Sequence, residues 1–270
     1  MSALVPLREL PLAEKRRRMS RWVRRLRSTS GPPAPPPERP AVDQLMLEHL
    51  VDELGPRRAE TGFQLLKREF VDWNEVRVSR QSELVKVLDA VGLTSEQASA
   101  VRGVLASLFE RTNALSLDHL RGKPQHEIDA ALGALGVSTR ARNSTAFLCL
   151  GANVLALSPA GLRVLKRLGA VHPSAEADGA LDELALVVAA DRRADFYWLF
   201  SAHARETCKE RGPLCRNCVL LKGCPTGQGR TARRRSARPP KERRPRAGRA
   251  PPRGAAKART VKRTRKKAKG

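Results

Sequence analysis

Hydrophobic residues recur at intervals of three and four through most of the chain, which is the spacing of one face of an α-helix. The clearest of these stripes are Leu45, Leu50 and Leu54; Leu84, Leu88 and Val91; Val101, Leu105 and Leu108; and Leu162, Leu165 and Leu168. Alternating β-branched runs are scarce. The pattern predicts an all-α domain of about eight to ten helices.

Capping residues mark where several of these helices begin. Thr94 followed by Gln97 has the form of a capping box, and Ser158 before Pro159 has the form of an N-cap with a first-turn proline. A helix is predicted over about 140–150, and the short segment 134–138 joins it to the helix before it. Glycine in that segment permits a tight turn with exposed backbone N–H groups, which with the next helix's N-terminus can hold one phosphate.

The net charge of +25 is concentrated at the two ends of the chain. Residues 1–40 hold 10 basic and 3 acidic residues, residues 225–270 hold 19 basic and one acidic, and residues 41–224 hold 23 of each. This division predicts a basic, proline-rich, disordered arm at 1–40 and an all-helical domain at 41–207. A cysteine-rich loop follows at 208–224, and a disordered Lys/Arg-rich tail at 225–270.

No hydrophobic run approaches the length needed to cross a bilayer, and the N-terminus lacks the apolar core of a secretory signal. The clustered cysteines do not resemble a secreted disulfide framework. We therefore expect no membrane partner and a monomer in a reducing compartment: cytoplasmic and nucleoid-associated, or nuclear in a eukaryote. Polycations bind polyanions by counterion release, so nucleic acid is the expected partner.

The residues with the most specific chemistry are Cys208, Cys215, Cys218 and Cys224, spaced C-x6-C-x2-C-x5-C. Four thiolates in one compact loop can enclose an iron–sulfur cluster or a tetrahedral zinc ion. Zinc usually uses two closely spaced cysteine pairs, so the wide gaps favour the larger cluster. The fifth cysteine, Cys149, lies in an apolar helix and is interpreted as a core residue.

This spacing, with Trp198-Leu199 before it and Pro213 inside it, resembles the cluster loop of endonuclease III and the adenine-specific mismatch glycosylases. The resemblance covers roughly residues 41–224. It implies a two-lobed helical fold with a helix-hairpin-helix motif, a 4Fe–4S cluster, and double-stranded DNA as the partner. On this basis the DNA-binding residues are predicted to be Leu135, Gly136, Val137, Ser138, Arg140, Arg142, Lys209, Arg211, Arg216 and Lys222.

The chain departs from that superfamily at both catalytic positions. When the chain is aligned with the superfamily's hairpin motif L-P-G-V-G-R-K, Arg140 takes the position of the nucleophilic lysine of bifunctional members. Ser158 takes the position of the catalytic aspartate that nearly all members carry. A guanidinium stays protonated and cannot form a Schiff base, and a serine hydroxyl cannot stabilise a cationic sugar. Displaced groups such as His49, Asp52 or Glu53 are not selected by any spacing.

Three functions therefore remain open at this stage. The first is a DNA-binding protein of the base-excision-repair superfamily without standard glycosylase or lyase chemistry. The second is an active, divergent DNA glycosylase with relocated catalytic groups. The third is a histone-like nucleoid-compacting protein in which the basic tail dominates.

Overall fold

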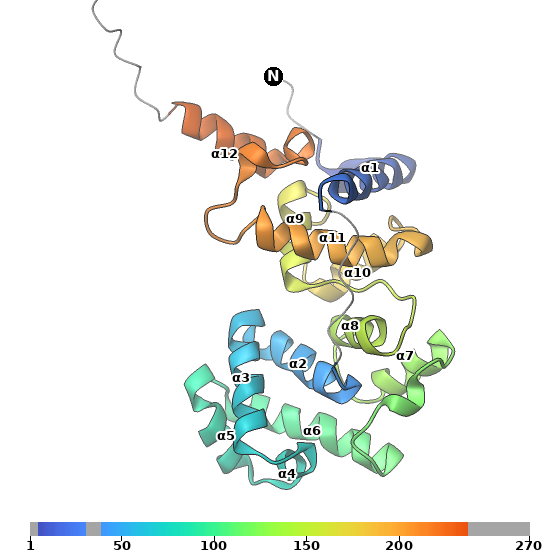
Figure 1. Ribbon diagram of the computed structural model, residues 1–270, viewed down its shortest axis with the longest axis vertical. Helices are drawn as coiled ribbons and strands as arrows, with labels where there is room; N and C mark the ends of the chain where they lie inside the picture. The colour runs from blue at the N-terminus through green and yellow to red at the C-terminus, as the bar shows by residue number, and fades with distance from the viewer. Residues whose placement is uncertain (1–4, 31–38, 237–270) are drawn as a thin grey trace, which may run out of the picture.

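The computed structural model describes residues 5–30 and 39–236, and these form helices, short turns and connecting loops without a strand. They are arranged as two helical lobes, one above the other in Figure 1. Each lobe has its own hydrophobic core, and the extended segment 150–158 carries the chain from one to the other. The all-α, two-lobed prediction is confirmed. No helix of the described residues is both long and apolar enough to cross a membrane.

The first lobe comprises residues 41–154, and its central helix is α2, which packs against α3, α6 and α8. Leu45, Met46 and Leu50 of α2 are fully buried there. The helices of this lobe are α2 (Ala41–Leu54), α3 (Pro56–Glu69), α4 (Trp73–Val78), α5 (Gln81–Leu88), α6 (Ser95–Thr112), α7 (Gln125–Gly133) and α8 (Thr139–Cys149). The predicted capping box is present at the start of α6, where Thr94 and Gln97 cap each other.

The second lobe comprises residues 5–30 and 155–236, so both ends of the described chain lie in it. Its core is built on Phe196 and Phe200 of α11, which packs against α1 and α9. The elements of this lobe are α1 (Leu12–Ser30), α9 (Pro159–Leu168), α10 (Ala177–Ala185), α11 (Arg193–Glu206), the 3-10 turns η5 (Cys215–Asn217) and η6 (Leu221–Gly223), and α12 (Pro225–Ser236).

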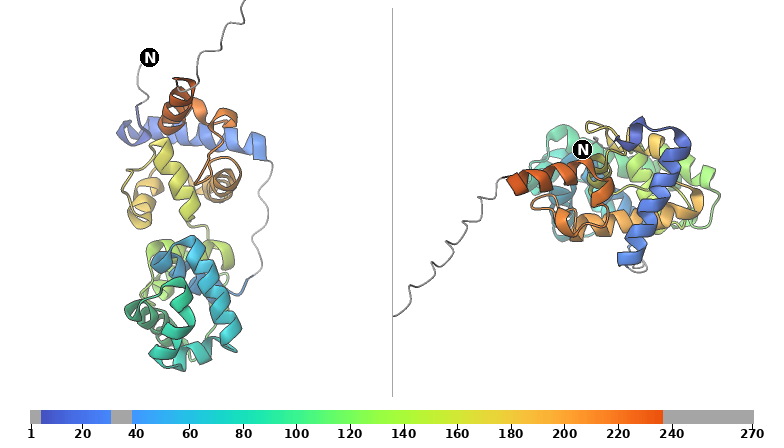
Figure 2. Two further views of the ribbon diagram at one scale, coloured as in Figure 1. Left: turned by 90° about the vertical axis from the view of Figure 1, so that its left-hand side faces the viewer. Right: turned by 90° about the horizontal axis from the view of Figure 1, so that it is seen from above.

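The basic arm predicted at 1–40 is wrong for most of its length. Residues 12–30 form α1, which lies across the second lobe (Figure 2). Met19, Trp22, Val23 and Leu26 are at most 3% exposed and belong to the second core. Burial of these four side chains stabilises the helix despite its arginines, since each buried large apolar side chain contributes about 1.5–3 kcal/mol.

The basic tail predicted at 225–270 is likewise wrong for its first part, because Pro225–Ser236 forms α12. This helix packs against α9 and the two 3-10 turns of the cysteine loop. Gly227 has its N–H directed at the Sγ of Cys224, at 3.2 Å. The predictions for residues 31–38 and 237–270 fall outside the described residues.

Candidate functional site

The turn between α7 and α8 is the hairpin predicted from the sequence. Gly136 has a φ of 73°, and no atom lies within 4 Å of the Cβ that a larger residue would add. The Ser138 hydroxyl caps α8 by accepting a hydrogen bond from the Ala141 N–H at 3.0 Å. The N–H groups of Val137 and Ser138 have no acceptor among the described residues. They are therefore the two donors that the turn leaves for a ligand.

The structure limits which groups of the predicted hairpin residues are available to contact DNA. The side chains of Leu135 and Val137 are buried in the first core, at 5% and 7% exposure, so they have only backbone groups to offer. The Arg142 guanidinium folds back over Gly133 and donates to Thr139 Oγ1 at 2.9 Å. Arg142 thus braces the hairpin.

The N-terminus of α8 is already occupied by a carboxylate. Asp178 of α10 accepts hydrogen bonds from the N–H groups of Thr139 at 3.0 Å and Arg140 at 2.8 Å. A carboxylate is stabilised at this positive end of a helix dipole. The prediction that the helix N-terminus itself holds phosphate is therefore wrong for these two donors, and the contact ties the two lobes together.

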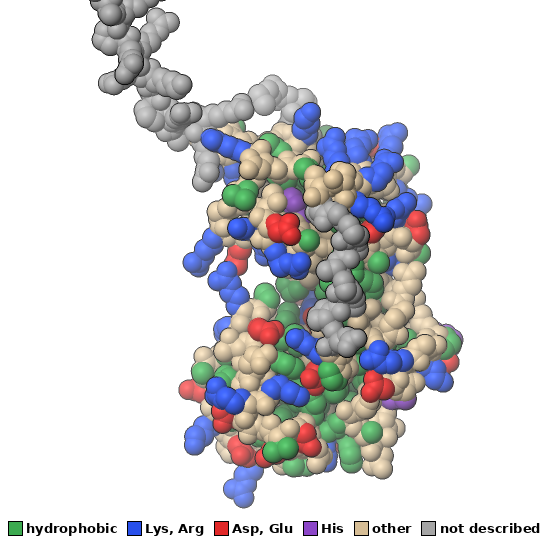
Figure 3. All heavy atoms as spheres, in the orientation of Figure 1, with side chains coloured by type: hydrophobic (Ala, Val, Ile, Leu, Met, Phe, Trp, Pro, Cys, Tyr) green, Lys and Arg blue, Asp and Glu red, His purple; other side chains and the backbone are tan. Residues whose placement is uncertain are grey.

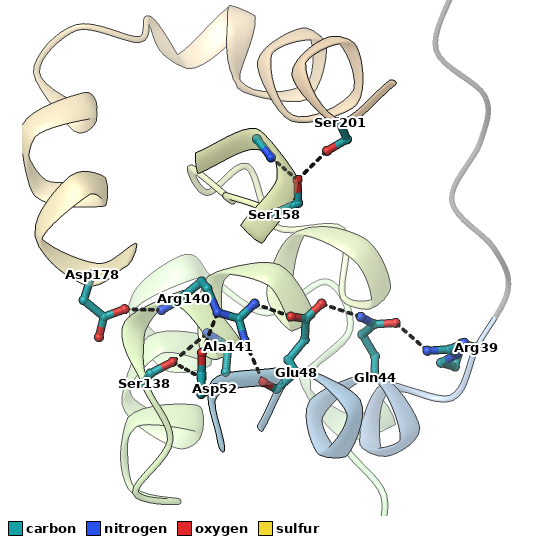
Figure 4. A network of polar contacts seen from close by, with 11 residues as sticks. Arg39, Gln44, Glu48, Asp52, Ser138, Arg140, Ala141, Ser158, Asp178 and Ser201 are labelled. Carbon is teal, nitrogen blue, oxygen red and sulfur yellow. Dashed lines mark hydrogen bonds and ion pairs between the residues drawn. The ribbon is translucent and has the colours of Figure 1, made fainter. Parts of the chain in front are cut away.

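Arg140 is one of the most deeply buried polar side chains, 2% exposed. Its Nε donates to Asp52 Oδ1 at 2.6 Å, its Nη1 pairs with the Glu48 carboxylate, and its Nη2 donates to the Glu48 carbonyl oxygen at 2.6 Å (Figure 4). Burial lowers the pKa of Arg140, but the Glu48 and Asp52 charges outweigh it and raise that pKa above its ordinary value. The position is a charged structural anchor with no lone pair for attack.

The ion pairs of Arg140 belong to a longer polar network between α2 and α8. Gln44 donates to Glu48 Oε1 at 2.7 Å, and the Ser138 hydroxyl donates to Asp52 Oδ2 at 2.6 Å. Each of the two carboxylates, Glu48 and Asp52, therefore accepts hydrogen bonds through both of its oxygens. Asp52, one of the candidates for a displaced catalytic acid, is held as the partner of a guanidinium and a hairpin hydroxyl.

His49, another of those candidates, is 6% exposed, and its Nε2 has no hydrogen-bond partner among the described residues. Burial lowers the pKa of His49, although Glu53 and Asp52 act in the opposite direction. The neutral ring is thus favoured, and within the described residues no hydrogen bond to Nε2 orients it as a base.

Ser158 caps α9, as the sequence predicts, by accepting a hydrogen bond from the Gly161 N–H at 3.0 Å. Its hydroxyl also lies 2.7 Å from the hydroxyl of Ser201 on α11 (Figure 4). Both partners are neutral. The hydroxyl therefore joins two helices of the second lobe and carries no negative charge.

The four cysteines of the loop line one shared cavity. None of the four forms a disulfide. The other lining residues include Val164, Leu168, Leu220 and His203. Among the described residues, no three His, Cys, Asp or Glu side chains come together closely enough to hold a single metal ion.

This arrangement fits a group larger than one ion, since four thiols surround a shared space instead of meeting at a point. Burial raises the pKa of the Cys224 thiol to about 11 and also raises that of Cys218. Burial likewise lowers the pKa of His203, whose Nε2 lies 3.6 Å from Cys218 Sγ, to about 4. Metal binding would displace the thiol protons. The positive charge of the metal would then stabilise the thiolates, which burial alone disfavours.

Arg167 of α9 fixes the start of the cysteine loop and was missed in the sequence analysis. Its guanidinium donates to the carbonyl oxygens of Cys208, Lys209 and Glu210 at 2.7–3.1 Å. The loop cations Lys209, Arg211, Arg216 and Lys222 are all exposed and have no ion-pair partner among the residues described. Glu210 reaches Arg57 of α3 at 3.2 Å, which links the cysteine loop to the first lobe. Figure 3 shows a hollow on the surface between the two lobes.

No protein-family model and no curated protein matches the chain. Solved structures do match it, however. The chain is similar to a non-covalent endonuclease III–DNA complex and a trapped endonuclease III–DNA covalent intermediate, with TM-scores of 0.64 and 0.63. Identity is 17% in both, over 80% of this chain and 98% of each of those chains. A thermostable thymine-DNA glycosylase matches with a TM-score of 0.57 and 18% identity, over 81% of this chain and all of that one.

These similarities show that the chain has the endonuclease III fold. They also agree with the two-lobed arrangement described above, in which the hairpin belongs to the first lobe and the cysteine loop to the second. At this level of identity the match establishes the fold, and function has to be argued from the site.

Proposed function

We propose that this chain is a DNA-binding protein of the helix-hairpin-helix glycosylase superfamily that holds duplex DNA without excising bases. The observation that carries the proposal is the environment of Arg140, a buried anchor between Glu48 and Asp52. The motif resemblance aligns this residue with the nucleophilic lysine. Ser158 supports it, because the residue that the resemblance aligns with the catalytic aspartate is a neutral helix cap.

DNA binding is supported by three surfaces on the endonuclease III fold. The hairpin offers the N–H groups of Val137 and Ser138, and the cysteine loop offers four exposed cations. The ends of the chain add a large positive charge. The first two can fix the position of backbone phosphates, while the surplus charge adds affinity that falls with salt.

The cysteine loop is proposed to hold a 4Fe–4S cluster on Cys208, Cys215, Cys218 and Cys224. The cavity that these thiols share is the supporting observation. When bound, the cluster would supply four metal–thiolate bonds that fix the loop. Arg167 then sets the direction in which the loop carries Lys209 and Arg211.

We expect no base release from a panel of oxidised, deaminated, alkylated and mismatched duplexes incubated with cluster-loaded protein. Endonuclease III and a mismatch glycosylase serve as positive controls for the substrates. Binding should still be measurable on the same duplexes. Release of any base that is abolished by Asp52→Asn or His49→Ala would favour the divergent-glycosylase alternative.

Replacing Gly136 by Glu is expected to weaken DNA binding about tenfold, because it puts a negative charge where the hairpin N–H groups would meet a phosphate. Gly122→Glu is the matched control, since Gly122 also has a positive φ, of 72°, and open space around it. Both substitutions should cost about 1–2 kcal/mol in backbone strain. Equal losses of affinity, measured by fluorescence anisotropy, would contradict a role for the hairpin.

The compaction alternative is tested by removing residues 237–270, which leaves α12 and its packing on the cysteine loop intact. The proposal expects weaker but still measurable binding at low salt, with a smaller dependence on salt. If the shortened protein retains its helical content and binds no DNA, the tail accounts for all binding and the compaction function is preferred.

A further inference from the structure

A wide groove lies between the cysteine loop and α12, outside the cleft between the lobes. It has a volume of about 690 Å³. Arg216 and Asn217 come from the loop, and Arg230, Thr231 and Arg233 come from α12. We refer to these five residues as the α12 groove. In Figure 1, α12 and the loop extend from the same side of the molecule as α3.

The α12 groove is cationic, and no carboxylate is among its lining residues. Arg216 and Arg230 are exposed and have no ion-pair partner within the described parts of the chain. Gathering the guanidinium groups of Arg216 and Arg230 along one groove raises their mutual repulsion. An anion that spans the groove would relieve that repulsion.

The shape and charge of the groove indicate an extended anion. Its volume exceeds that of a single small ion, and its arginines come from two separate elements. Planar guanidinium groups match the oxygens of phosphates in a bidentate manner. In addition, α12 leads directly into residues 237–270, which hold 15 basic residues and one acidic residue.

We propose that the α12 groove binds the phosphodiester backbone of the same nucleic acid, at a place separate from the hairpin. This proposal rests on the proposed DNA-binding function and adds a second anchoring point to it. Arg216 and Arg230 contact phosphate oxygens from opposite walls, and the strand runs along α12.

The test measures binding of a blunt random-sequence duplex to the full-length protein at physiological salt. Arg216→Gln/Arg230→Gln removes the two proposed phosphate contacts from the groove, and Arg246→Gln/Arg249→Gln removes two charges from the segment beyond α12. Losing two fixed phosphate contacts should weaken binding at least about tenfold. The control pair should weaken it less than about threefold, because the other cations of that segment substitute for the lost ones.

A second variant keeps the test decisive, because Arg230 also lines the cysteine cavity and its loss can disturb folding. Thr231→Glu places a carboxylate in the groove, and Thr231 is not among the residues lining that cavity. The proposal is supported if Thr231→Glu weakens binding and the groove pair, where it folds, weakens it more than the control pair.

The proposal is overturned if Thr231→Glu binds like the unmodified protein, or if the folded groove pair loses no more affinity than the control pair. The unmodified protein separates this result from a failure of the proposed function. If it binds DNA normally in that experiment, only the groove assignment fails. If it binds no duplex at low salt, DNA binding and the groove assignment both fail.

Discussion

Replacing Glu48 by Ala should lower the free energy of unfolding by about 3–5 kcal/mol, because it leaves the buried Arg140 charge without its main partner. The side chains of Arg140 and Glu48 are only 2% and 10% exposed, so water cannot take over from the lost carboxylate. Asp52 would remain, but its side chain is 28% exposed and is shared with Ser138. Chemical denaturation followed by circular dichroism measures the change.

Two further variants show whether this loss comes from the uncompensated charge. Glu110→Ala removes an exposed helical carboxylate that has no ion pair in the described structure, and it should change stability by less than about 0.5 kcal/mol. Glu48→Leu/Arg140→Met removes both buried charges and should recover most of the stability, since apolar residues commonly replace buried ion pairs at little cost. A double variant as unstable as Glu48→Ala would contradict this explanation.

The chemistry of Arg140 was predictable from the sequence, but its environment was not. A guanidinium cannot act as an amine nucleophile wherever it lies. Glu48 and Asp52, however, lie one helical turn apart on α2 and are separated from Arg140 by about 90 residues of chain. The sequence analysis therefore connected neither carboxylate with Arg140, because only the packing of α2 on α8 brings them together.

The role of Asp178 is a second feature that could not be predicted from the sequence. Nothing near it in the sequence indicates that its carboxylate occupies the start of α8, because the contact is made between lobes. Ser158, by contrast, was predicted correctly because a cap depends only on the residues that follow it. Local signals were thus sufficient for caps, the hairpin turn and the helical stripes.

The first helix was mispredicted for a reason visible in its composition. Met19, Trp22, Val23 and Leu26 have helical spacing, but the many arginines between them favoured the interpretation as a solvated arm. The α1 helix has a narrow apolar face and a broad charged one. A stripe of this kind forms a helix when a partner surface covers it, and α11 provides that surface.

Replacing Cys218 by Ser is expected to prevent cluster assembly and to destabilise the second lobe by several kcal/mol. The loop residues Cys218, Leu220 and Cys224 pack into or against the second core, so a loop without its metal would loosen that core as well. Iron and acid-labile sulfide are measured in freshly isolated protein, and thermal unfolding is followed in parallel.

Cys149→Ala is the matched control, because Cys149 is also a buried free thiol but belongs to the first core. It should keep the full complement of iron and sulfide and show only a modest loss of stability. Zinc in place of iron would assign the loop to a structural zinc site, and equal metal loss in both variants would contradict the ligand assignment. Either result would leave the endonuclease III fold in place, because helix packing and the match to solved structures establish it without the metal.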